Sequence, residues 1–250
     1  MTNNNQSDKV RRKWILLMIL VLFIAAIGYG QFRLRRASAL QIFTETISYV
    51  TTSEKIVALT FDDGPNPNAT EPILDILREH GVLATFFVTG ENAKRHPDLI
   101  RRIIAEGHEL GNHSWDHTRL TYKSPDFIRQ QIQQTDELLR YLEYDGTIHF
   151  HAPFGHGLFI LPHTLMRMER PHILWSITLY DWEDISPVDM LEKLDRQIAP
   201  GAIILLHDGY TEDEYQSRQA TVELVEMILQ TYLAEGYTFA TISTLVDKQY

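Results

Sequence analysis

The stretch that decides the fold is KIVALTFDDGP, residues 55–65. Lys55 to Phe61 is a short, apolar, β-rich run, and Asp62 and Asp63 follow it directly, before Gly64 and Pro65. Such a run, bounded by turn residues, predicts a buried strand. Asp, Gly and Pro also favour turns without any ligand, which is the alternative interpretation of the motif. Two charges against an apolar strand are costly to bury, however, unless a cation or hydrogen bonds compensate them.

Strand and helix patterns alternate along the rest of the chain. We expect helices at 68–80, 97–106 and 125–142 and near Pro162, Pro187 and Ser217, and strands at 82–88, 147–150, 173–177, 202–206 and 238–240. This alternation predicts parallel β/α units, in a barrel or an open sheet. Each polar cluster lies just past the C-terminal end of an expected strand, where barrel enzymes gather their active sites. A barrel is therefore favoured.

Two histidines four positions apart, His113 and His117, follow the glycine-punctuated run GHELGN, residues 107–112. This spacing also arises by chance on exposed helices and loops, but here it falls on a loop or at a helix start, after an expected strand. One carboxylate and two histidines form an open ligand set that leaves a zinc-like ion a free position for water. The second carboxylate can take the proton of that water. The sequence therefore predicts a metal-dependent hydrolase.

His207 ends the apolar run 203–206 and enters the turn Asp208-Gly209. One interpretation is a strand-end histidine satisfied by local hydrogen bonds. The other is a general acid that protonates a leaving group at the same end of the barrel. Trp175 and Trp182 fit the core or a pocket wall, and they are also able to stack on a sugar.

Residues 14–30 carry no charge and lie between basic residues on both sides. We expect a transmembrane anchor there, with 1–13 as a cytoplasmic tail, 31–53 as a connector and 54–250 as the catalytic domain. A cleaved signal peptide is the alternative, because Ala26-Ile27-Gly28 resembles a cleavage site. The basic residues slightly favour a cytoplasmic N-terminus, and hence a single-pass protein of the cell membrane with an extracellular domain.

Charge is divided unevenly along the chain. Residues 1–39 hold seven of the 23 basic and one of the 33 acidic residues, which leaves 16 basic and 32 acidic side chains for residues 40–250. So acidic a domain repels phosphate backbones, which argues against nucleic acid as a partner and favours a neutral polymer or small molecule. The absence of cysteine excludes disulfides and thiolate metal sites. The oligomeric state is left open.

Five ordered motifs make the chain resemble the polysaccharide deacetylases of carbohydrate esterase family 4, over residues 55–245. They are TFDDGP at 60–65, HSxxH at 113–117, APFG at 152–155, DW at 181–182 and LLHD at 205–208. The resemblance implies an α/β fold, an irregular (β/α)7 barrel, here preceded by one N-terminal transmembrane helix. It also implies metal-dependent removal of acetyl groups from N-acetylglucosamine polymers such as peptidoglycan or chitin-like glycan, or less often of O-acetyl groups from xylan.

The same resemblance assigns the site residues. Asp63, His113 and His117 would hold a divalent metal, which in this family is usually zinc. Asp62 would be the base that deprotonates the attacking water, and His207 the acid that protonates the departing amine. Pro153, Phe154 and Trp182 would contact the substrate, with a backbone N–H near Phe154 at the oxyanion. His151 and Asp181 would support these groups.

Two positions depart from the family pattern. An arginine that pairs with the base usually stands where His151 is, and an acidic residue where Thr178 is. A histidine near its reference pKa of about 6.5 is mostly neutral above pH 7, so we expect Asp62 to be held less firmly and activity to be lowered or acid-shifted. Asp181, Glu183 or Asp184 could replace the missing carboxylate.

The leading interpretation is a membrane-anchored, metal-dependent glycan N-deacetylase. Two alternatives remain open at this point: a catalytically weak glycan-binding homologue, suggested by His151 and Thr178, and a hydrolase of small amides on the same fold.

Overall fold

The computed structural model describes residues 45–155, 157, 159–210 and 217–249, together with Trp14 and Met18. The chain divides into two compact units, residues 1–40 and 41–250. Except for those two side chains, the expected span at 14–30 lies outside the described residues, as do the expected tail at 1–13 and part of the connector. Within the described part of the chain, no helix has the length and apolarity needed to cross a membrane.

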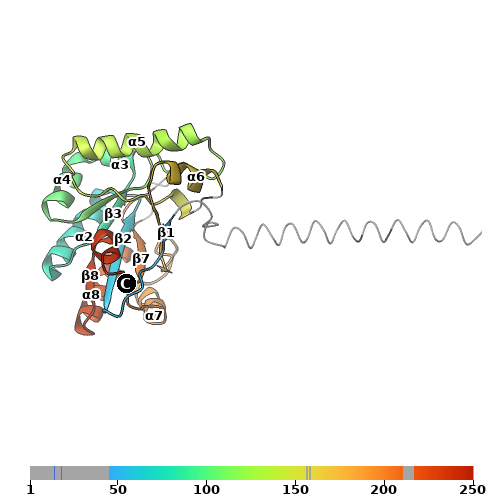
Figure 1. The fold of residues 1–250 in the computed structure, drawn as a ribbon. Helices are drawn as coiled ribbons and strands as arrows, with labels where there is room; N and C mark the ends of the chain where they lie inside the picture. The colour runs from blue at the N-terminus through green and yellow to red at the C-terminus, as the bar shows by residue number, and fades with distance from the viewer. Residues whose placement is uncertain are drawn as a thin grey trace, which may run out of the picture. The chain divides into compact units, whose positions relative to one another are not determined.

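A parallel β-sheet forms the centre of the second unit (Figure 1). Its strands run in the order β4-β3-β2-β7-β6, and β8 pairs with the first part of β2. Their bounds are β2 Ile56–Asp62, β3 Thr85–Val88, β4 Glu109–Asn112, β6 Ile177–Thr178, β7 Ile203–His207 and β8 Thr238–Ala240. Every pair in this sheet is parallel, which confirms the expected class of α/β fold.

Bridges beyond β4 curl the sheet towards a barrel-like arrangement. Phe150 pairs in parallel with Asn112 at the end of β4 and with His172 at the start of β5 (His172–Ile173). β1 (Thr46–Ile47) pairs with β5. The strand expected at 147–150 is thus reduced to one bridging residue, Phe150. The strand expected at 173–177 is divided into β5 and β6, which pair with different neighbours.

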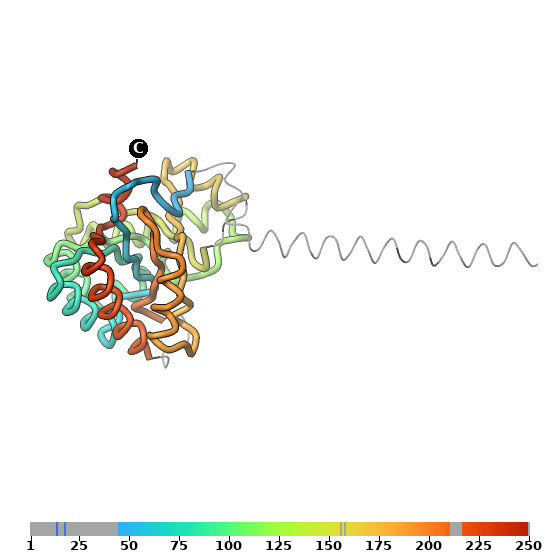
Figure 2. The backbone as a smooth tube through the Cα atoms, turned by 90° about the horizontal axis from the view of Figure 1, so that it is seen from below, coloured from blue at the N-terminus to red at the C-terminus, as the bar shows by residue number. Residues whose placement is uncertain are grey.

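Helices surround the strands. Their bounds are α2 Pro67–His80, α3 Gly90–Arg95, α4 Pro97–Ala105, α5 Pro125–Tyr141, α6 Ile160–Arg167, α7 Pro187–Asp195, α8 Gln219–Ala234 and α9 Ile242–Val246. The side chains of Asn66, Ser124 and Ser186 cap α2, α5 and α7, each followed by a proline in the first turn, as sequence rules predict. Neighbouring helices pack in the series α7-α8-α2-α4-α3-α5-α6, and Figure 2 shows the chain winding round the strands.

The alternation of side chains along the strands creates two cores and directs the polar residues inward. Val57, Leu59 and Phe61 of β2 belong to the core beneath the helices, whereas Ile56 and Ala58 belong to a second core on the inner face. Because successive side chains of a strand point to opposite faces, Asp62 lies on the inner face. On β7 the inner series runs from Ile203 to His207, which is the register partner of Asp62.

Candidate metal centre and active site

The functional side chains come from the C-terminal ends of the parallel strands. Asp62 ends β2, His207 ends β7, and His113 directly follows β4. Asp63 and His117 have left-handed backbone conformations, with φ of 72° and 58°. Asp and His tolerate this region better than most residues, and the turns bring both side chains back over the strand ends.

Asp63, His113 and His117 converge, and we call them the outer triad. Asp63 Oδ1 lies 3.5 Å from His113 Nε2 and 3.4 Å from His117 Nε2. The ligand atoms of the three residues all lie within 4.8 Å of one another. The structure therefore brings together the three side chains that the sequence analysis expected to share one cation.

The outer triad fits a divalent metal ion. His113 Nδ1 donates a hydrogen bond to the His151 carbonyl oxygen at 2.9 Å, so that the lone pair is on Nε2, which faces Asp63. Burial lowers the pKa of His113 well below 6.5, and a neutral imidazole is the form that binds metal. Asp63 Oδ1 is buried without a hydrogen-bond partner among the described residues. A cation between these atoms would satisfy it.

Asp62 lies beside the triad as the expected base. Its Oδ2 is 3.6 Å from His113 Nε2 and 3.5 Å from His151 Nε2, and its Oδ1 has no hydrogen-bond partner in the described chain. Burial raises the pKa of Asp62 well above 3.8, against the opposing effect of His207. A carboxylate with a raised pKa is a stronger base, as proton removal from water requires.

His207 is held by a buried carboxylate. Its Nδ1 donates to Asp181 Oδ1 at 2.9 Å, while the His207 backbone N–H and the Thr221 hydroxyl donate to Asp181 Oδ2 at 2.8 and 2.9 Å. Burial alone would lower the pKa of His207, but Asp181, with Asp63 and Asp62, raises it to about 9. The ring is therefore protonated at neutral pH and able to donate a proton from Nε2.

His151 stands next to the base, in the place expected for a supporting residue. Its ring stacks on Trp175 at 5.1 Å and 10°. Burial lowers the pKa of His151 well below 6.5, so the ring stays neutral across the physiological range. The expectation of an acid-shifted activity assumed a ring that gains its charge near pH 6.5, and the buried position removes that basis. The separation of 3.5 Å from Asp62 fits the expected loose hold on the base.

Exposed aromatic rings flank the site on two sides. Phe154, in the short helical turn η1 (Pro153–Gly155), is 45% exposed and lies 4.5 Å from the His117 ring. Trp182 is 36% exposed and lies 5.0 Å from the His207 ring. Pro153 is buried beneath the turn. Phe154 thus borders the outer triad, and Trp182 borders His207.

Of the three carboxylates that could replace the one absent at Thr178, only Asp181 lies inside the site. Asp181 is buried against His207, whereas Glu183 and Asp184 are exposed. The Thr178 hydroxyl is itself buried without a hydrogen-bond partner among the described residues.

Sequence reasoning gave no role to Asp208, although it belongs to the LLHD motif. This side chain is fully buried, accepts a hydrogen bond from the Thr70 hydroxyl at 2.6 Å and leaves Oδ1 without a partner in the described chain. Burial, together with Asp63, raises the pKa of Asp208 to about 7. A charged residue directly after a strand-end histidine was the available signal, but its inward direction depends on the tight turn at Gly209.

Several known proteins are similar to this chain. Residues 49–160 match the family model described as Polysaccharide deacetylase. A chitooligosaccharide deacetylase from Azorhizobium caulinodans is 34% identical over 195 residues, which cover 75% of this chain and 93% of that protein. A solved peptidoglycan N-acetylglucosamine deacetylase is similar with a TM-score of 0.75 at 29% identity, over 83% of this chain and 96% of that one. A CE4 family pseudoenzyme from Bacillus anthracis is similar with a TM-score of 0.73 at 26% identity, over 82% and 70%.

Both the relatives and the order of the site residues along the chain point the same way. This chain belongs to the polysaccharide deacetylases, the hydrolases of carbohydrate esterase family 4.

Proposed function

We propose that this enzyme is a metal-dependent N-deacetylase that releases acetate from N-acetylglucosamine units of a glycan, either cell-wall peptidoglycan or a chitin-like polymer. The observation that carries the proposal is the outer triad with Asp62 beside it and the protonated His207 beyond. The similar proteins named above act on chitooligosaccharide and on peptidoglycan, which supports this substrate class.

Asp63, His113 and His117 would hold the ion, for which we propose Zn²⁺ because a carboxylate and two imidazoles suit it. When bound, the ion supplies Lewis acidity towards the acetyl carbonyl and the attacking water. Asp62 accepts the proton of that water as its oxygen attacks the carbonyl carbon. His207 then gives its proton to the nitrogen as the C–N bond breaks, which leaves acetate and a free amine.

Phe154 and Trp182 would wall the substrate site. Exposed aromatic rings offer apolar faces to the C–H surface of a sugar. Phe154 lies beside the proposed metal ligand His117, and Trp182 lies beside the proposed acid His207. We also assign the backbone N–H near Phe154 to the oxyanion, as a donor fixed by the turn at η1.

Acetate release from defined glycans tests the proposal. The purified protein, stripped of metal with a chelator and reloaded with Zn²⁺, should free acetate from chitooligosaccharides or peptidoglycan more than from acetylxylan or small amides. Zinc uptake without acetate release from any N-acetylated glycan between pH 5 and 8 would contradict it. That result would favour a catalytically weak glycan-binding homologue. The departures at His151 and Thr178 and the similarity to a pseudoenzyme support this second candidate.

We further propose that the catalytic unit forms an irregular (β/α)7 barrel and that residues 14–30 anchor it in the cell membrane with the catalytic unit outside. The uncharged run between basic flanks supports the anchor. The full chain should sediment with membranes and be digested by protease added to intact cells, whereas a variant without residues 1–40 should stay in the supernatant. Equal distribution of the two proteins would contradict the anchor.

A further inference from the structure

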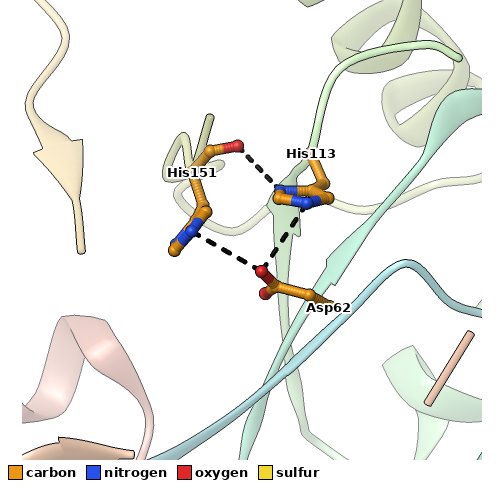
Figure 3. Close-up of side chains that lie close together, drawn as sticks. All are labelled: Asp62, His113 and His151. Carbon is orange, nitrogen blue, oxygen red and sulfur yellow. Dashed lines mark hydrogen bonds and ion pairs between the residues drawn. The ribbon is translucent and has the colours of Figure 1, made fainter. Parts of the chain in front are cut away.

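A second group of metal-binding side chains lies directly beside the first. Asp62, His113 and His151, which we call the inner triad, have ligand atoms within 4.8 Å of one another, and all three residues are only 2% exposed. Figure 3 shows the two rings pointing towards the carboxylate. Asp62 Oδ2 is 3.6 Å from His113 Nε2 and 3.5 Å from His151 Nε2.

The two triads share one lone pair. His113 belongs to both, and its Nδ1 is occupied by the hydrogen bond to the His151 carbonyl oxygen. Only Nε2 remains as a ligand atom, and a neutral imidazole offers one lone pair there. An ion therefore takes either the outer or the inner triad, but not both with full coordination.

We propose that the inner triad is a second cation position, which binds a divalent transition-metal ion in place of the outer position. In that state Asp62 is a ligand. The consequence for catalysis rests on the proposed function: an ion at the inner position would coordinate Asp62, which could then no longer accept a proton, and the enzyme would be inactive. The binding site itself stands on the geometry alone.

The inner triad is built rigidly enough to bind an ion. His151 fixes His113 through its backbone carbonyl and also contributes its own ring to the site. That ring is confined by Trp175, stacked at 5.1 Å, and by Phe87 at 5.3 Å. Ligands that are held in place before binding lose little entropy when the ion arrives.

Charge and burial define which ions fit. Asp63, Asp181 and Asp208 each add negative potential at Asp62, which favours a cation. Two imidazoles and one carboxylate suit Zn²⁺, Co²⁺ or Cu²⁺. Mg²⁺ keeps several waters and prefers oxygen ligands, and an almost fully buried triad of this composition offers neither.

The test isolates the inner triad by disabling the outer one. The double variant Asp63→Asn, His117→Ala removes the outer carboxylate and imidazole, and asparagine suits the left-handed backbone at position 63. We expect this variant to retain one Zn²⁺ through gel filtration, measured by elemental analysis. Bound Cu²⁺ should show two imidazole nitrogens in pulsed electron paramagnetic resonance.

Adding His151→Phe to the double variant keeps a ring between Trp175 and Phe87 but removes the ligand nitrogen. Zinc affinity measured by calorimetry should fall about tenfold or more, and the copper signal should show one imidazole. His149→Phe in the same background is the matched control, because His149 is two residues away and contacts Ser243 at 2.9 Å. It should change neither reading. Circular dichroism checks folding, and His151→Gln replaces His151→Phe if that variant does not fold.

Three outcomes separate the hypotheses. If the double variant binds no ion, or if the change at His151 leaves its affinity unaltered, the inner position is disproved. If the unaltered protein binds zinc and releases acetate while the double variant binds none, only this inference fails. If the unaltered protein binds no metal ion at all, the metal-dependent mechanism under the proposed function fails with it.

Discussion

Two carboxylate–histidine pairs with different geometries lie in this site. Asp62 and His151 face each other at 3.5 Å, both buried, with the carboxylate of raised pKa as acceptor. Asp181 and His207 are closer, at 2.9 Å, and there the charged ring is the stable form. The two histidines thus take opposite protonation states, because burial lowers the pKa of His151, whereas the charge and hydrogen bond of Asp181 outweigh burial at His207.

Asp62→Asn should abolish turnover but keep the metal ion. An amide cannot accept the proton of the attacking water, so the rate should fall about 100-fold or more, while the outer triad stays intact. Acetate release and zinc content, measured on one preparation, check both parts. Asp98→Asn, at an exposed position on α4, is the control. Activity near that of the unaltered protein would remove Asp62 from the role of base.

Asp181→Asn should shift the pH profile. His207 must be protonated to donate, so activity is lost as the pH rises through its pKa, which Asp181 helps to raise to about 9. Without that charge the pKa falls towards its ordinary value, and the basic limb of kcat/KM should move to lower pH. Profiles on a soluble chitooligosaccharide provide the measurement. An unmoved basic limb would show that Asp181 only supports the local structure.

At the level of elements, the turns after β2 and β7 interlock. A Cβ atom added to Gly64 would lie 2.3 Å from the Asp208 carboxylate oxygens, and one added to Gly209 would lie 2.1 Å from the Asp63 carbonyl group. The backbone N–H of Asp208 also donates to the Asp62 carbonyl oxygen at 3.1 Å. The turn after His207 therefore fixes the turn after Asp62.

Gly209→Ala should weaken both folding and metal binding. The methyl group must push the backbone at Asp63, which we expect to cost about 1–3 kcal/mol of the free energy of unfolding. Urea denaturation and zinc calorimetry measure the two effects. Gly236→Ala is the control, because alanine is strained there by the φ of 82° and so also costs folding free energy, but nothing lies within 4 Å of the added atom. Equal zinc affinity in the two variants would contradict the interlocked turns.

The sequence predicted most elements but not the irregular ones. Long amphipathic helices with side-chain caps, such as α5 after Ser124, carry their own signals. For β4 the sequence indicated only that a strand region precedes the histidine pair, without bounds, because Gly111 weakens any strand pattern. That glycine is required by a neighbour, since its Cβ would lie 2.2 Å from the Phe87 ring. The short helix α3, whose first N–H groups donate to the Ser114 and Trp115 carbonyl oxygens, and the two bridges at Phe150 likewise depend on contacts from distant segments.

The site was predictable where chemistry and position coincide. Asp63, His113 and His117 could be grouped because they follow parallel strands, and strand ends meet at one edge. The inner triad could not be predicted in this way. His151 faces Asp62 only because the neighbouring Phe150 pairs with Asn112 of β4 and with His172 of β5, and the sequence shows no sign of this pairing. The depressed pKa of His151 likewise follows from burial, which the sequence does not display.

At the scale of the whole molecule, residues 45–50 form a clasp, that is, a segment that pairs with β5 and packs onto the rest of the catalytic unit. Val50 is fully buried and its N–H donates to the Gly201 carbonyl oxygen, while the Ile47 carbonyl oxygen accepts from Leu174 N–H. These residues fall in the segment expected to be a connector, and they lie in the compact unit 41–250. The folded catalytic unit thus includes residues upstream of position 54.

Two truncations should differ in stability. Removal of residues 1–40 should leave the Tm of the catalytic unit unchanged, whereas removal of 1–53 deletes β1 and exposes the surface that Ile47 and Val50 cover. Loss of two buried aliphatic side chains should cost about 3 kcal/mol or more. Differential scanning calorimetry of the two variants, compared with the full chain, checks this. Identical melting temperatures would show that the clasp contributes nothing to folding.

The proposed metal ligands follow β2 and β4, whereas the proposed proton donor ends β7, far along the chain. We expect the loss of His207 alone to leave the outer triad, Phe154 and Trp182 in place. Such a variant should still bind the glycan but no longer release acetate, so affinity and turnover depend on separate parts of this architecture.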